Sequence, residues 1–299
     1  MGGGSYDYLS RSVRTEKYAS RSQNEIFRER NLNSQMSPKG VKVRESRDSK
    51  EHPNSFPIII ALDVTGSMGS IPTYLIKNGF PNLMKGIIDS GVADPQVLFL
   101  AIGDHECDQA PLQVGQFESS DELLDYWLEH VWLEGRGGGN DGESYHLAWY
   151  FAGYHTSTDS FEKRGKKGVL ITVGDEKVLP NIGERDLRSI MGDGQYSSLS
   201  RFELLDKAKE SWDCYHLHIL EGNGDRQSTR DDWKQVIGDH LVMVADKTTV
   251  DKVISDIIIK SYNSTESTKL PPLGEFSGKP HSQQKEENKN SEYKPTTIL

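Results

Sequence analysis

Residues 57–69, Pro-Ile-Ile-Ile-Ala-Leu-Asp-Val-Thr-Gly-Ser-Met-Gly, constrain the fold more than any other part of this chain. An apolar run of strand length, residues 58–62, stops at a carboxylate, and two hydroxyl residues follow within four positions. Such a run is typical of a parallel strand buried on both faces. Asp63, Thr65 and Ser67 would then lie at the carboxyl end of that strand, where open α/β sheets bind ligands. One carboxylate and two hydroxyls are hard oxygen ligands, which favour Mg²⁺, Mn²⁺ or Ca²⁺ over Zn²⁺.

The rest of residues 53–263 alternates strand signals with helix signals. Two further apolar runs, 97–102 and 168–173, lead into Gly103-Asp104 and Gly174-Asp175. The apolar spacing predicts helices over 71–90, 118–132, 143–155, 200–212 and 250–262, and strands over 214–220 and 241–245. The short alternating segment 112–117 favours an antiparallel edge strand. Together these signals predict one α/β domain, built on a Rossmann-like, doubly wound and mostly parallel sheet with helices on both faces.

The segments on either side of this domain differ from it in composition. Residues 1–52 hold 11 Lys/Arg against 7 Asp/Glu, a net charge of +4. Because the whole chain has a net charge of −10, the remaining residues carry −14. We expect a basic, flexible N-terminal arm or a segment ordered only against the domain, and a disordered tail over 264–299. The acidic body argues against non-specific nucleic-acid binding through the main domain.

No apolar stretch approaches the roughly 18 residues of a membrane-spanning helix, and the first residues lack a signal-peptide pattern. Two cysteines, Cys107 and Cys214, are too few for a disulfide scaffold. We therefore expect a soluble, cytoplasmic protein.

Three separate motifs resemble those of the von Willebrand factor A (vWA) domain and its metal-ion-dependent adhesion site (MIDAS). In that family the first strand ends in Asp-x-Ser/Thr-x-Ser, matched here by Asp63, Thr65 and Ser67. A Gly-rich loop before a helix and an Asp after a later strand, matched by Asp175, complete the pattern. The resemblance covers about residues 57–262 and is to the intracellular bacterial or phage type.

The Gly-rich loop departs from the family pattern, because residues 136–144 contain no Thr to serve as the second ligand. The loop is more similar to the Gly-Gly-Gly-Asp-x-Pro-Glu loops of vWA domains found with some atypical kinases. Asp141 is the leading substitute, with Glu143 and Ser144 as alternatives; an acid at Glu143 would also suit the first turn of a helix.

The resemblance implies binding rather than bond-breaking. It implies that Thr65 and Ser67 coordinate the cation directly, that Asp63 and Asp175 act through water, and that an acidic residue of a protein partner completes the coordination. It also suggests a partner class, the MoxR-type AAA+ ATPases, by analogy with intracellular bacterial vWA proteins.

Two other functions stay open. Haloacid-dehalogenase-like (HAD-like) Mg²⁺-dependent phosphohydrolases also place a nucleophilic Asp after an apolar strand, which would make Asp63 the nucleophile. However, Thr65 stands where their second Asp is expected, and no general acid is evident. Alternatively, the chain is a structural vWA-like protein with a degenerate metal site. A nucleotide-binding loop is disfavoured, because Gly-Arg-Gly-Gly-Gly lacks the Gly-Lys-Ser/Thr ending.

Overall fold

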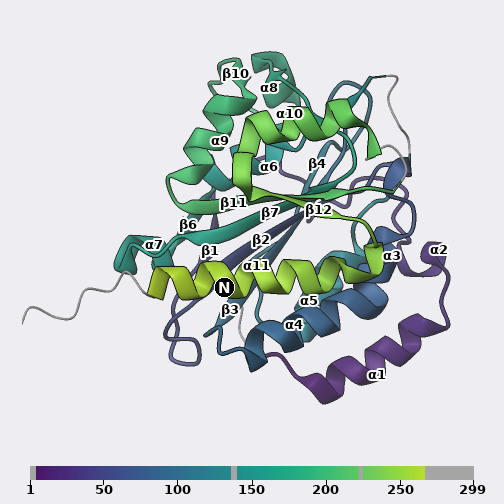
Figure 1. Ribbon diagram of the computed structural model, residues 1–299, viewed down its shortest axis with the longest axis vertical. Helices are drawn as coiled ribbons and strands as arrows, with labels where there is room; N and C mark the ends of the chain where they lie inside the picture. Colours follow the sequence, from purple (N-terminus) through teal and green to yellow (C-terminus); the bar gives the residue numbers. More distant parts are fainter. Residues whose placement is uncertain (1–4, 136–139, 222–224, 267–299) are drawn as a thin grey trace, which may run out of the picture.

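The computed structural model describes residues 5–135, 140–221 and 225–266, in which a six-stranded sheet lies between layers of helices (Figure 1). The sheet contains β2 (Phe56–Asp63), β3 (Pro95–Ile102), β4 (Leu112–Val114), β7 (Gly168–Gly174), β11 (Trp212–Ile219) and β12 (Leu241–Val244). The helices are α1 (Tyr8–Ala19), α2 (Gln23–Ile26), α3 (Ile71–Tyr74), α4 (Phe80–Asp89), α5 (Asp121–Glu129), α6 (His146–Tyr154), α7 (Asp159–Arg164), α8 (Glu184–Met191), α9 (Arg201–Lys209), α10 (Gln227–Ile237) and α11 (Val250–Glu266). Three two-stranded ladders pair β1 (Arg44–Ser46) with β6 (Thr156–Thr158), β5 (Gly142–Glu143) with β8 (Lys177–Val178), and β9 (Asn181–Ile182) with β10 (Leu199–Ser200). Residues 136–139 of the Gly-rich loop and most of the expected disordered tail, 267–299, lie outside the described residues.

The strand order across the sheet is β12-β11-β7-β2-β3-β4. Every neighbouring pair is parallel except β3 and β4, which run antiparallel at the edge. The predicted fold class, including the antiparallel edge strand, is confirmed. From β2 the chain first builds outward through β3 and β4, then returns to the other side of β2 with β7. The gap between the ends of β2 and β7 is therefore the topological switch point, the usual ligand position in such sheets.

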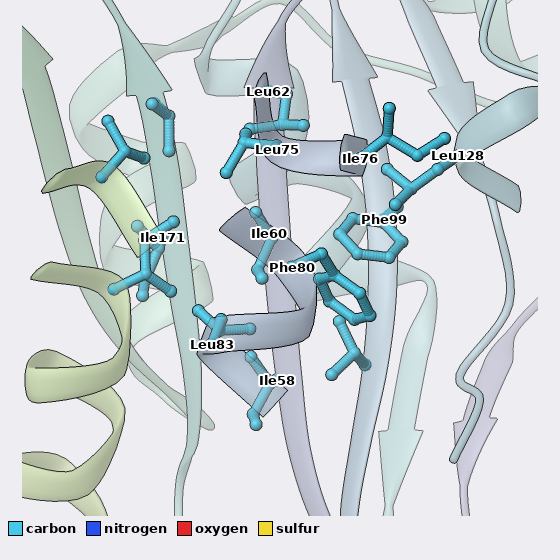
Figure 2. Close-up of a cluster of buried hydrophobic side chains, with 14 of the residues drawn as sticks. Ile58, Ile60, Leu62, Leu75, Ile76, Phe80, Leu83, Phe99, Leu128 and Ile171 are labelled. Atoms are coloured by element: carbon cyan, nitrogen blue, oxygen red, sulfur yellow. The ribbon is translucent and has the colours of Figure 1, made fainter. Parts of the chain in front are cut away.

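Alternating residues of the central strand enter two separate cores. Ile58, Ile60 and Leu62 face the layer that holds α4, α5 and α11, and Figure 2 shows them beside Phe80 and Leu83 of α4. The residues between them, Ile59 and Ala61, face a second core formed with α6, α8, α9 and α10. All eight residues of β2 are buried, which explains why the strand reads as an unbroken apolar run.

Residues 5–52 differ from the flexible arm that composition favoured, because they lie against the domain. Helix α1 contacts α5 and α4, and Tyr18 and Met36 are almost completely buried. Arg11 and Arg14 both form ion pairs with Asp125 of α5. These contacts place residues 5–52 against the domain in this structure. Long-range charge pairs and scattered aromatic residues hold the segment, which explains why it shows no local periodicity.

The long predicted helix over 71–90 is present, but it is not regular. Its middle, Leu75–Gly79, forms a π-helical turn between α3 and α4. Helices α7, α8 and α10 and the three short ladders were not predicted from the sequence. None of the described helices is both long and apolar enough to span a membrane.

Candidate metal centre

The Asp-x-Thr-x-Ser motif lies at the carboxyl end of β2, at the switch point. Asp63 is the last residue of β2, and its side chain is completely buried. Its Oδ1 accepts a hydrogen bond from the Thr65 backbone N–H at 2.8 Å, a local turn that bends the chain sharply after the strand. This turn leads into a short 3₁₀ turn, Gly66–Met68, in which Ser67 is exposed. The motif thus runs from the buried Asp63 and Thr65 to the exposed Ser67.

Hydrogen bonds bring together four of the five predicted site residues. The Thr65 hydroxyl donates to Asp63 Oδ1 at 2.6 Å, and the Ser67 hydroxyl donates to Asp175 Oδ1 at 2.8 Å. The two hydroxyl oxygens are 3.3 Å apart. Asp175 follows β7 directly, so the residues that contact each other come from both sides of the switch point. The sequence separation between Ser67 and Asp175 is 108 residues, and only the fold can close it.

Tyr145 belongs to the same network, although sequence reasoning did not identify it. Its hydroxyl donates to Asp63 Oδ2 at 2.6 Å, so both carboxylate oxygens of Asp63 are engaged. Tyr145 immediately precedes α6 and is fully buried. A Cβ at Gly174 would lie only 1.8 Å from the Tyr145 hydroxyl, so Gly174 is required for this approach. A glycine at the end of a buried strand is the one sequence signal that a close contact occurs there.

Asp141, the leading choice for the loop ligand, takes a different position. Its side chain is 72% exposed, and its carboxylate lies 3.5 Å from Arg226 Nη1 and 3.9 Å from Lys177 Nζ. Ser144, one of the two alternatives, accepts a hydrogen bond from the His105 backbone N–H at 2.8 Å. These contacts are with residues outside the Asp63–Asp175 network.

Glu143 is the loop residue with the environment of a ligand. It is only 5% exposed, and its Oε2 has no hydrogen-bond partner among the described residues. Glu143 pairs with Val178 in the short β5–β8 ladder, so it lies beside the start of the segment that follows β7. Burial, followed by the charges of Asp63 and Asp104, raises the pKa of Glu143 to about 10. A buried carboxylate with an unused oxygen, close to other acids, is what a cation would compensate.

The same electrostatic stress acts on Asp63. Burial raises its pKa to about 7, and the nearby charge of Asp175 adds to this, whereas hydrogen bonds from Thr65 and Tyr145 oppose it. Burial also raises the pKa of Tyr145, so this residue stays a hydrogen-bond donor. The buried carboxyl groups of the site therefore cannot all be ionised unless a positive charge lies near them.

The donor set fits a hard divalent cation. Each hydroxyl donates its proton to a carboxylate, which leaves the hydroxyl lone pairs free for a metal. Adjacent ligands of an octahedron with bonds of about 2.1 Å are roughly 3.0 Å apart, close to the 3.3 Å between the Thr65 and Ser67 hydroxyl oxygens. No group of three or more His, Cys, Asp or Glu side chains is placed to hold a metal within the described ranges. A cation here would thus depend on the hydroxyls as well as on the acids.

Comparisons with known proteins add only weak similarities. No family model and no curated protein matches this chain. Among solved structures, the open conformation of the pilus adhesin SpaC from Lactobacillus rhamnosus GG has 11% identity and a TM-score of 0.46, and the match covers 73% of this chain but 31% of SpaC. A von Willebrand factor type A protein from Catenulispora acidiphila has 14% identity and a TM-score of 0.39, over 70% of this chain and 43% of the other. The vWF domain of the pilus tip protein Mfa5 from Porphyromonas gingivalis has 10% identity and a TM-score of 0.43, over 70% and 95%. This chain thus corresponds to less than half of the first two proteins, and likenesses at this level say nothing about its function.

Proposed function

We propose that this protein is a metal-dependent protein-binding module, in which a divalent cation at the switch point engages an acidic side chain of a partner. The observation that carries the proposal is the contact between Ser67 and Asp175, which joins the two motif segments across the sheet. The unused Glu143 oxygen and the two proton-donating hydroxyls support it further.

The residues divide into hydroxyls and acids. Thr65 and Ser67 would hold the cation through their hydroxyls, with Ser67 on the exposed side where a partner can approach. Asp63, Asp175 and Glu143 would balance its charge from the buried side, with Glu143 in the place first given to Asp141. A bound Mg²⁺, Mn²⁺ or Ca²⁺ would supply an electrophilic open position for a carboxylate. Tyr145 orients Asp63 by its hydrogen bond.

The overall charge strengthens the need for a cation. The chain carries a net charge of −10, so an acidic partner surface would be repelled without a positive charge at the contact. A protein partner with an exposed Asp or Glu is the class that this site would select. A MoxR-type AAA+ ATPase remains one candidate of that class, by analogy.

Hydrolysis by a HAD-like mechanism is less compatible with this geometry. A nucleophilic carboxylate needs one oxygen free to face its substrate. Asp63 is fully buried, and its two oxygens accept hydrogen bonds from Thr65 and Tyr145. This arrangement supports binding, in which Asp63 shapes the site without reacting.

Metal titration tests the proposal with a matched pair of variants. In the full-length protein, Mg²⁺ or Mn²⁺ at about 100 times its Kd should stabilise the fold by about 2.7 kcal/mol, because the metal binds only the native state. Ser67→Ala should lose most of this stabilisation, and calorimetry should show little metal uptake. Ser70→Ala is the control, because Ser70 is exposed and makes no capping hydrogen bond with its side chain.

Partner capture tests the second half of the proposal. Pull-downs from the native host should recover a partner in Mg²⁺ but not in EDTA, and Ser67→Ala should fail in both. Metal uptake that is unchanged in Ser67→Ala, or absent from the folded wild-type protein, would overturn the assignment. A partner that binds equally well in EDTA would restrict the cation to a structural role.

A further inference from the structure

The helical segment that follows the Ser67 loop contains an irregular π turn, Leu75–Gly79, caused by Pro81. In a regular helix each carbonyl accepts from the N–H four residues later. Here the Phe80 N–H instead bonds Leu75 O, five residues back, as a π turn requires. The next residue, Pro81, has no N–H to offer. The Ile76 carbonyl is thereby left without a main-chain donor, inside the protein, because Ile76 is fully buried.

Arg11 of α1 satisfies this carbonyl. Its Nη2 donates to Ile76 O at 2.6 Å, across 65 residues of sequence, and the arginine is only 2% exposed. The same guanidinium forms an ion pair with Asp125 of α5, which fixes its orientation. A charged donor on a buried carbonyl is one of the stronger kinds of hydrogen bond.

Two more contacts join the N-terminal segment to the same part of the chain. Lys77 Nζ, within the π turn, donates to Arg21 O at 2.5 Å. Gln23 Nε2 donates to Gly69 O at 3.3 Å, two residues after Ser67. The segment from Arg11 to Gln23 therefore contacts both the loop that carries Ser67 and the helical turn behind it.

The π turn controls where that loop lies. Helix α4 is fixed by its buried residues Phe80, Leu83 and Met84. A π turn accommodates one extra residue, so its loss would rotate α3 by roughly 100° and shift it by about 1.5 Å relative to α4. Ser67 lies only four residues before α3, so such a change would move its hydroxyl away from Asp175.

We propose that Arg11 is a positioning residue for the metal site: by capping the Ile76 carbonyl it holds the π turn, and the π turn holds Ser67 in place. The N-terminal segment then helps to position a ligand of the site. The inference rests on the proposed function for its metal readout, but the hold on the turn can be measured without metal.

The test compares Arg11→Met with Arg14→Met in the full-length protein. Arg14 lies on the same helix as Arg11 and forms ion pairs with Asp125 and Asp121. Its hydrogen bonds go to Asp125 and Ser10 rather than to the π turn, so its replacement reproduces the loss of charge alone. Without metal, Arg11→Met should speed amide hydrogen exchange at residues 75–80, whereas Arg14→Met should not. With Mn²⁺ as the probe, Arg11→Met should weaken binding by about tenfold or more, the usual effect of losing a supporting contact.

A second test uses a Pro81→Ala background. It distinguishes capping of the Ile76 carbonyl by Arg11 from a purely structural role of Arg11. Alanine restores an N–H that can bond the Ile76 or Lys77 carbonyl, so Arg11→Met should have a smaller effect on exchange at residues 75–80 in that background. Equal effects in the wild-type and Pro81→Ala backgrounds would overturn the proposal, and so would equal Mn²⁺ loss in the Arg11 and Arg14 variants. Faster exchange in Arg11→Met with unchanged Mn²⁺ affinity would also overturn it. If the wild-type protein takes up no Mn²⁺, the proposed function fails, while the exchange comparison still decides whether Arg11 holds the turn.

Discussion

Replacing Glu143 by Gln should stabilise the metal-free protein while weakening the proposed metal site. Glu143 is buried, and in the folded state its pKa is raised from 4.5 to about 10. A carboxyl group with a raised pKa holds its proton in the native state but releases it on unfolding, so the free energy of unfolding falls as pH rises from 4.5 toward 10. At pH 7 this cost is roughly 3 kcal/mol, from 1.36 kcal/mol for each of the 2.5 pH units above 4.5. At pH 5 it is below about 1 kcal/mol. Gln has the same shape without this cost.

Urea unfolding of the two proteins in EDTA at both pH values measures the difference. Glu143→Gln should gain on the order of 3 kcal/mol at pH 7 and much less at pH 5. In a chain of this size that corresponds to roughly 6–12 °C in Tm at pH 7. With saturating Mg²⁺ the order should reverse, because the neutral amide cannot balance the cation.

Glu118→Gln is the matched control for this experiment. Glu118 is also buried, and burial raises its pKa, but it bonds Trp127 and lies outside the metal-site network. Its replacement should leave Mg²⁺ uptake unchanged. The reasoning fails if Glu143→Gln destabilises the metal-free protein at pH 7, or if its effect is the same at pH 5 and pH 7.

Two further substitutions test the buried side of the site. Tyr145→Phe removes the donor to Asp63 Oδ2 and should cost about 1–3 kcal/mol in urea unfolding, since a buried carboxylate loses a partner; a loss below about 0.5 kcal/mol would show that this hydrogen bond does not support Asp63. Gly174→Ala places a Cβ where the Tyr145 hydroxyl lies, so it should destabilise the protein by about 3 kcal/mol or more and also weaken Mn²⁺ binding. Wild-type stability in Gly174→Ala would mean that Tyr145 can move aside freely.

The central strands and the carboxylates at their ends could be predicted from sequence, because their signals are local. The apolar runs 58–62, 97–102 and 168–173 correspond to β2, β3 and β7, whose residues are buried almost throughout. The weaker alternation over 112–117 correctly indicated the antiparallel edge strand β4. Once parallel strands are assumed, their carboxyl ends lie at one edge of the sheet, which is why Asp63 and Asp175 could be placed there. That β2 and β7 are neighbours is known only from the structure.

The polar helices could not be predicted in the same way. Helix α8, Glu184–Met191, buries only Leu187, Ile190 and Met191 and is otherwise polar. Helix α10, Gln227–Ile237, is similar in character. Their amphipathic patterns are short and were hidden among turn-forming residues, so packing against the second core, rather than local preference, determines them.

The choice between Asp141 and Glu143 shows a different limit. The two residues are two positions apart on one loop, and both are acids that a cation could accept. The deciding element is the ladder β5–β8, only two residues long on each strand. So short a ladder has no periodicity of its own, and the sequence offers no way to tell which acid turns inward.

Pro81 marks the boundary between what sequence shows and what only the fold can supply. A proline within a helical pattern indicates that a carbonyl in the preceding turn lacks a donor. This much is visible in the sequence around residue 81. The donor, however, comes from Arg11, a residue in a segment whose composition favoured a flexible arm. A buried carbonyl must accept a hydrogen bond. The Ile76 carbonyl that Pro81 leaves without a main-chain donor therefore requires the N-terminal segment to be ordered where Arg11 can reach it. A basic segment beside an acidic domain is thus placed by specific hydrogen bonds, and its order should persist in salt that screens its surface charges.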